Sequence, residues 1–66
     1  MKQFNVILVQ ADKVDAMEKV LNRYRIALSD WDRTRAFNYY GVLYVNYTIL
    51  CTADMFAAIE HAMARV

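Results

Sequence analysis

The chain has 66 residues, 59% of them hydrophobic, and a formal net charge of +1. This length predicts a single domain, residues 1–66, that buries only about 60% of the surface exposed by its unfolded form. The small net charge excludes a sequence-wide basic field for nucleic acid and an acidic mimic of DNA. No apolar run approaches the roughly 20 residues needed to span a bilayer, so we expect a cytoplasmic protein with no membrane partner.

The first half of the chain predicts a strand, a helix and a loop. Residues 4–9 favour a strand, and the unbroken apolar run from Val6 to Val9 is typical of one covered on both faces. Asp12 is then predicted to cap a helix whose apolar residues recur at three- and four-residue spacing as far as Leu28. Residues 29–32 break this spacing and predict a loop.

Residues 33–39 fit two predictions. As a strand, the segment places alternate side chains on one side, namely Arg33, Arg35, Phe37 and Tyr39. As a helix, it would end at Gly41, since a glycine commonly follows the last helical residue. The strand is favoured because β-formers and aromatic residues crowd the segment, and because a hairpin through Gly41 joins it simply to the next strand.

The second half predicts a strand and a helix. Residues 43–51 predict a strand whose odd-numbered residues face one side, while Val42, Tyr44, Asn46, Thr48 and Leu50 face the other. Thr52 is predicted to cap the last helix. The order β-α-β-β-α defines an α+β fold, a small two-layer sandwich with its helices on one face of an antiparallel-rich sheet. It is ferredoxin-like without the closing fourth strand, which would have to follow Val66.

The same order of elements resembles that of RNA-recognition motifs, whose third strand carries a short signature of glycine, aromatic and basic residues. Four positions match this signature: Gly41, Tyr44, Val45 and Tyr47. Three depart from it, where the basic, aromatic and small residues are replaced by Tyr40, Val42 and Leu43. The resemblance implies binding of single-stranded RNA or DNA, with Tyr44 and Phe4 as the stacking rings.

The cysteine and histidine counts bear on chemistry. One cysteine, Cys51, excludes an internal disulfide, and with the single histidine, His61, it leaves a zinc site short of ligands. We read Cys51 as a small buried hydrophobe and His61 as a solvated surface residue, and we predict no metal, no cofactor and no enzymatic activity. Because small domains usually need disulfides, a metal or a partner subunit, we expect a homodimer or larger homo-oligomer.

Two groups of residues are candidates for partner binding. The sheet face that carries Tyr44, Asn46 and Phe4 should be open and apolar, as interfaces are. The predicted loop contributes residue types enriched at binding hot spots, because it places Trp31 near Arg33 and Arg35.

The sequence therefore predicts a small, non-catalytic protein-interaction module. We expect it to self-associate and to bind or inhibit a larger protein partner, as a small regulatory protein of a phage or mobile element would. The alternative is single-stranded nucleic-acid binding through the open sheet face, Phe4 and Tyr44 acting with the arginines.

Overall fold

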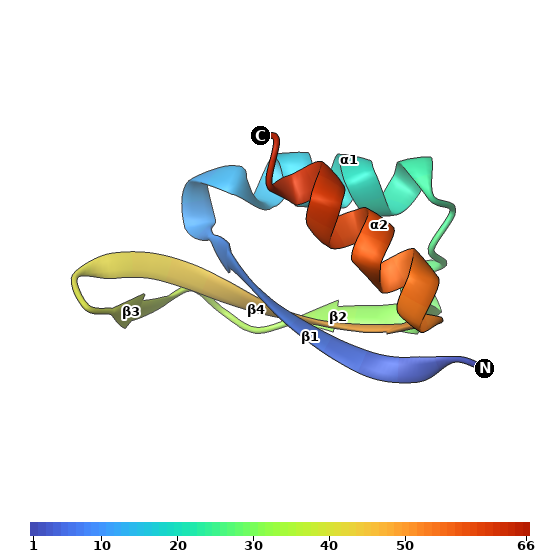
Figure 1. The fold of residues 1–66 in the computed structure, drawn as a ribbon. Helices are drawn as coiled ribbons and strands as arrows, with labels where there is room; N and C mark the ends of the chain where they lie inside the picture. The colour runs from blue at the N-terminus through green and yellow to red at the C-terminus, as the bar shows by residue number, and fades with distance from the viewer.

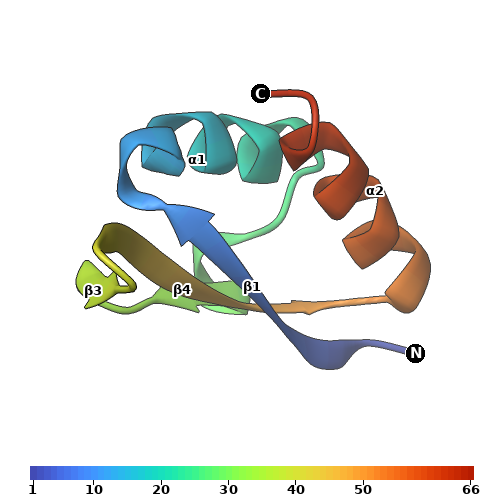
Figure 2. The same cartoon turned by 60° about the vertical axis from the view of Figure 1, so that its left-hand side comes forward.

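The computed structural model describes residues 1–66. In chain order its elements are β1 (Gln3–Gln10), the 3-10 turn η1 (Ala11–Lys13), α1 (Val14–Arg23), the 3-10 turn η2 (Leu28–Asp30), β2 (Trp31–Arg33), β3 (Phe37–Tyr39), β4 (Val42–Cys51) and α2 (Ala53–Met63). Both helices lie on the same side of one sheet (Figures 1 and 2). This arrangement confirms the predicted two-layer α+β fold. No helix is long and apolar enough to cross a bilayer.

The sheet is antiparallel throughout and centred on β4. Strand β1 pairs along one side of β4, while β2 and β3 pair along the other. The helix α1 connects β1 to β2, which lie on opposite sides of β4. This is the split β-α-β connection expected from the order of the elements.

Strand β1 is covered on one face only. Val9 is buried against the helices, whereas Phe4, Val6 and Leu8 alternate with the covered residues and are exposed. The prediction that this strand is covered on both faces is therefore wrong for the single chain. Within the apolar run, Ile7 and Val9 pack against the helix layer, whereas Val6 and Leu8 lie on the uncovered face.

Helix α1 is shorter at both ends than predicted. Its N-cap position is Lys13, whose ammonium group donates only and makes no capping bond, whereas the predicted cap, Asp12, lies within the turn η1. At its other end Arg25 adopts a positive φ of 58°, and the Ile26 N–H bonds to the Leu21 carbonyl at 3.0 Å. These features form a Schellman motif, which ends the helix. Leu28 accordingly lies outside the helix and is 81% exposed.

A bulge separates β2 from β3. Arg33 pairs with Tyr47 and Phe37 pairs with Tyr44, so three residues, 34–36, stand opposite two, 45 and 46. Thr34 holds the bulge, because its Oγ1 accepts the Asn46 N–H at 3.1 Å and its own N–H bonds to the Asn46 carbonyl at 3.0 Å. The favoured strand is thus present, but as two pieces.

The bulge changes which side chains share a face. An extra residue shifts the register by one, and such a shift moves the following side chains to the opposite face. Arg33 lies on the helix side with Tyr47, whereas Phe37 and Tyr39 lie on the uncovered side with Tyr44 and Val42. The prediction that Arg33, Arg35, Phe37 and Tyr39 share one side is therefore wrong.

A two-residue turn joins β3 to β4. Tyr40 and Gly41 have positive φ values of 52° and 81°, as in the type I′ turns that suit the twist of hairpins. The Asn38 side chain reinforces the turn, since its Oδ1 accepts the Gly41 N–H at 3.0 Å. This hairpin extends beyond the region that the helices cover (Figure 1).

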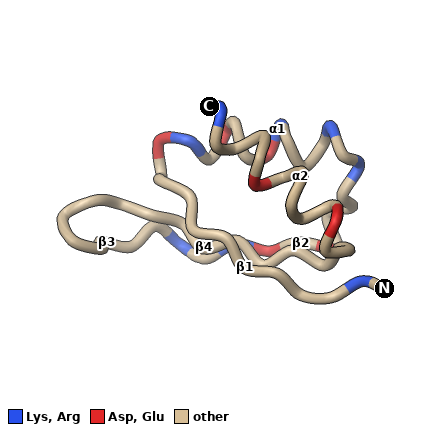
Figure 3. Tube along the Cα trace, in the orientation of Figure 1, with Lys and Arg blue, Asp and Glu red and all other residues tan.

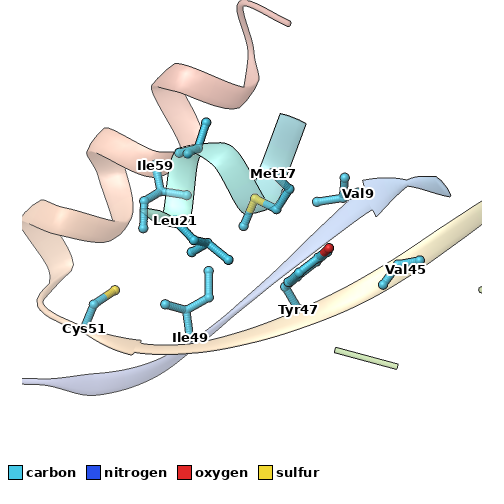
Figure 4. Packing of buried hydrophobic residues seen from close by; sticks show 9 residues of the cluster. Val9, Met17, Leu21, Val45, Tyr47, Ile49, Cys51 and Ile59 are labelled. Atoms are coloured by element: carbon cyan, nitrogen blue, oxygen red, sulfur yellow. The ribbon is translucent and has the colours of Figure 1, made fainter. Parts of the chain in front are cut away.

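The core lies between the helices and the odd-numbered residues of β4 (Figure 4). Its buried members come from β1, α1, β4 and α2: Val9, Met17, Val20, Leu21, Val45, Tyr47, Ile49, Cys51 and Ile59. The predicted alternation of β4 is confirmed from Val45 to Cys51. Thr52 caps α2 as predicted, because its Oγ1 accepts the Met55 N–H at 3.1 Å.

Candidate protein-interaction face

The uncovered side of the sheet, which we call the open face, is defined by the strand register. Side chains that stand opposite each other in an antiparallel pair lie on the same face. The members contributed by the strands are Phe4, Val6, Leu8, Gln10, Asp32, Phe37, Tyr39, Val42, Tyr44, Asn46, Thr48 and Leu50.

A row of large apolar side chains crosses the open face on β1. Phe4, Val6 and Leu8 are 75%, 59% and 43% exposed. Each stands opposite a half-buried residue of β4, and for Phe4 this partner is Leu50. Since exposed apolar surface that is contiguous marks interaction sites more often than isolated residues do, this row is a candidate for contact with another molecule.

Aromatic rings extend the open face toward the hairpin. The Tyr39 ring meets the Tyr44 ring edge to face, with centroids 6.0 Å apart and an interplanar angle of 75°. Tyr40 makes a similar contact with Tyr39 at 4.6 Å. Such edge-to-face pairs stabilise each other beyond the area that they bury. The hairpin therefore presents its tyrosines as an organised group.

The open face carries little charge. Asp32 is the one charged side chain among its strand residues, and the middle of β4 adds the neutral Asn46 and Thr48. Strand β1 and the β3–β4 hairpin contain no charged residues. Most Lys, Arg, Asp and Glu residues lie on the helices and near β2 (Figure 3). This composition matches the uncharged centre of a protein–protein interface.

Trp31 does not lie in a loop, as the sequence had suggested, but begins β2. It pairs with Ile49 on the helix side, is half buried and packs against the core. Its ring lies 5.6 Å from the Tyr47 ring at an interplanar angle of 39°. The apolar surroundings of Trp31 come from β4 and not from its neighbours in sequence, which is why residues 29–33 gave no sign of them.

Arg33 belongs to a polar cluster on the helix side. Its Nη1 lies 3.1 Å from Glu18 Oε2, and the buried Tyr47 hydroxyl donates to the same oxygen at 3.0 Å. Burial raises the pKa of Tyr47 from its ordinary value of 10.0 to about 12. The hydrogen bond to Glu18 acts in the same direction, and Arg33 acts against it. The cluster connects β2, β4 and α1.

Arg35 lies in the bulge and is exposed. With Arg33 and Thr34 it lines a hollow of about 590 Å³ whose other wall includes Ala11, in the turn η1, and Val14, the first residue of α1. Those residues belong to the helix layer. The two arginines thus lie together, on the side of the sheet away from the rings of Phe4 and Tyr44.

The structure divides the six predicted partner-binding residues into two groups. Phe4, Tyr44 and Asn46 share the open face, whereas Trp31, Arg33 and Arg35 lie on the helix side or in the bulge. Sequence reasoning missed four apolar or aromatic members of the open face, Val6, Leu8, Phe37 and Tyr39, and two polar ones, Gln10 and Asp32. Val6 and Leu8 alternate along the strand with Asn5, Ile7 and Val9, which is a possible sign that they lie on the other face. The sign is weak, because residues 6–9 are all apolar.

The remaining residues with reactive side chains lie apart from the open face. Cys51 is buried in the core, and burial raises the pKa of its thiol, while the nearby Asn5 amide, 3.5 Å from Sγ, acts in the opposite direction. His61 is exposed and lines a hollow between the helices with Ala62 and Arg65. No three His, Cys, Asp or Glu side chains lie close enough together to hold a metal ion.

Comparisons with models of protein families, with curated proteins and with solved structures found no match. The class that the chain defines is that of a small α+β protein with helices on one face of its sheet and an apolar open face on the other.

Proposed function

We propose that the protein is a non-catalytic protein-interaction module that self-associates and acts by binding, and thereby modulating or inhibiting, a larger protein partner. The observation that carries this proposal is the row formed by Phe4, Val6 and Leu8 on a face with one charged strand residue. Burying such a row in an interface contributes about 25 cal/mol per Å² of apolar area removed from water. The proposal places the module in the cytoplasm, where the free Cys51 thiol stays reduced.

The alternative, binding of single-stranded nucleic acid, uses rings on the same face. Phe4 and Tyr44 are placed as stacking residues would be, but affinity for nucleic acid also depends on cations that meet the phosphates. Arg33 contacts Glu18 on the helix side, and Arg35 lines the hollow beside α1. The charge on the open face, from Asp32, has the wrong sign for phosphate. The protein partner is therefore the better supported occupant.

A capture experiment with matched variants tests the proposal. Wild type, Phe4→Ser and Leu28→Ser are immobilised and exposed to an extract of the native host. Both substitutions remove a large exposed apolar side chain, but Leu28 lies outside the sheet. We expect a protein that wild type and Leu28→Ser retain and Phe4→Ser loses, and equal capture by all three would contradict the proposal. Titration with labelled single-stranded RNA and DNA is the second arm, in which affinity that falls steeply with salt would favour the alternative.

A further inference from the structure

The outer edge of β1 has no partner within the chain. β1 pairs with β4 alone, and no backbone hydrogen bond outside that ladder and the helical turns involves its residues. The strand is eight residues long, so this edge is extended. Unpaired edges of this kind are templates on which another strand can add.

The hydrogen bonds of β4 show which groups point outward. Asn46 directs both its N–H and its carbonyl toward Thr34, on the β2 side. Since backbone groups alternate along a strand, Tyr47 and the other odd-numbered residues of β4 direct theirs toward β1. The odd-numbered residues of β1 form hydrogen bonds with these groups of β4. The even-numbered residues Phe4, Val6 and Leu8 therefore direct their N–H and carbonyl groups toward the free edge.

The two edges of the sheet differ in how they are protected. Natural edge strands avoid further pairing by means of charges, prolines, bulges or short lengths. The β2–β3 edge is interrupted by the bulge at Thr34, and the outward Arg33 N–H already bonds to Asp32 Oδ1 at 2.8 Å. Strand β1 contains no charge, proline, glycine or bulge from Gln3 to Gln10. One edge is blocked and the other is open.

We propose that the open edge of β1 pairs with β1 of a second copy of this chain, antiparallel and about a two-fold axis. The pairing is self-complementary, as a two-fold interface must be, because the outward groups of Phe4, Val6 and Leu8 meet the same set from the partner. With the axis at Val6, Phe4 of each copy faces Leu8 of the other on the open face. No charged side chain meets its own copy in this arrangement.

Helix α2 lies over the same edge and adds side-chain contact. Met63 lines a hollow of about 190 Å³ together with Leu8 and Gln10 of β1, and Figure 1 shows α2 on the β1 side of the helix layer. The side chains of an added strand that point toward the helices would enter this layer beside Met63. With the axis at Val6, the side chains opposite Ile7 and Val9, which line this hollow with Met63, are Asn5 and Gln3 of the other copy. The helix layer therefore adds polar side-chain contact to the backbone hydrogen bonds.

The inference rests on the self-association in the proposed function and assigns it to a particular surface. Pairing through the edge leaves both open faces uncovered and joins them into one continuous sheet surface. The dimer would thus present the rows of Phe4, Val6 and Leu8 from both copies to a larger partner. If the copies stacked instead through their open faces, that surface would be lost.

Amide exchange of the wild-type protein separates these arrangements. Edge pairing predicts a two-chain mass by light scattering, against 7.7 kDa for one chain, and slow exchange at Phe4, Val6 and Leu8 that becomes fast on dilution. The Asn38 amide, outward on the other edge, is the fast-exchanging control. A single-chain mass at all concentrations overturns both self-association and the edge. A dimer in which these three amides exchange fast contradicts edge pairing alone. Slow exchange of the three amides in a monomer would show that another segment of the chain pairs with the β1 edge, which also contradicts edge pairing between copies.

Two substitutions at Val6 provide an independent test. Val6→Pro keeps an apolar side chain but removes the outward N–H, which has no partner within the chain, so the fold should tolerate it. Val6→Thr keeps the N–H and makes the side chain polar. Edge pairing predicts that Val6→Pro raises the dimer dissociation constant at least about tenfold while Val6→Thr changes it little. A larger increase of the dissociation constant for Val6→Thr than for Val6→Pro would show that the open faces stack. Circular dichroism checks that each variant is folded.

Discussion

The Tyr47 hydroxyl donates a hydrogen bond of 3.0 Å to Glu18 Oε2, although the tyrosine is fully buried and the glutamate lies at the surface of α1. Arg33 contacts the same oxygen at 3.1 Å. One carboxylate oxygen therefore holds side chains from β4 and β2. The ring of Tyr47 is thereby fixed in the core while its polar end reaches the edge of the helix layer.

Tyr47→Phe tests this link. The change removes one hydroxyl and should lower the free energy of unfolding by about 1 kcal/mol, because Glu18 loses a charge-assisted hydrogen bond. In a domain of this size the thermal midpoint would fall by about 4–8 °C per kcal/mol. Tyr44→Phe is the matched control, since its hydroxyl has no hydrogen bond within the chain. Equal midpoints for the two variants would show that the Glu18 bond contributes nothing.

Alkaline pH should destabilise the fold through Tyr47. Its pKa is about 12 in the folded chain and 10.0 when unfolded, so the folded state binds its proton more tightly. The resulting stability is complete below pH 10 and is lost as pH rises toward 12, by roughly 2–3 kcal/mol in all. Burial raises the pKa of Cys51 above 9.0 as well, so the loss should begin near pH 9. Urea unfolding between pH 8 and 12 measures it, and Tyr47→Phe should show a distinctly smaller loss.

The fold class followed from local patterns, whereas the site did not. The alternation in β4 and the Thr52 cap are local signals, and both are confirmed. The position of Trp31 depends on a strand from another part of the chain, and the orientation of Arg33 relative to Phe37 depends on one inserted residue. No periodicity within residues 29–39 contains that information.

The open face illustrates the same limit. Tyr44 and Asn46 were assigned to it correctly, because alternation in a ten-residue strand determines sides. Val6 and Leu8 were missed because an unbroken apolar run predicts a strand that is buried on both faces. Only the pairing of β1 with β4, and the helices on one side, show that half of that run is uncovered.

Trp31→Ala should destabilise the fold, because the ring packs on Tyr47 and the core. Truncation of a fully buried tryptophan costs about 3–5 kcal/mol, so for a half-buried one we expect about 2 kcal/mol and a midpoint lower by several degrees. Trp31→Phe, which retains a ring, should recover most of the loss. Blue-shifted fluorescence in the free protein would accompany this result. An unchanged midpoint together with weaker partner capture would instead return Trp31 to the binding surface.

In the bulge between β2 and β3, residues 34–36 stand opposite residues 45 and 46 of β4. Deleting Arg35 would leave two residues opposite two, while Arg33 would still face Tyr47 and Phe37 would still face Tyr44. We therefore expect a folded protein with a regular ladder and unchanged faces, within about 1 kcal/mol of wild type. The Thr34 N–H keeps its bond to the Asn46 carbonyl, and the Thr34 carbonyl replaces Oγ1 as the acceptor of the Asn46 N–H.

Proton NMR can follow the Arg35 deletion residue by residue. The close approach of α protons between Asn38 and Leu43, which marks the present hairpin register, should persist. A new approach between Ala36 and Val45 should appear, because the deletion makes them direct partners. Deleting Asn38 is the control, since it removes a paired residue and the side chain that binds the Gly41 N–H, and it should lower the midpoint far more. If the Arg35 deletion instead moved Asn38 opposite Tyr44, Phe37 would turn toward the helices, and the bulge would not be what determines its face.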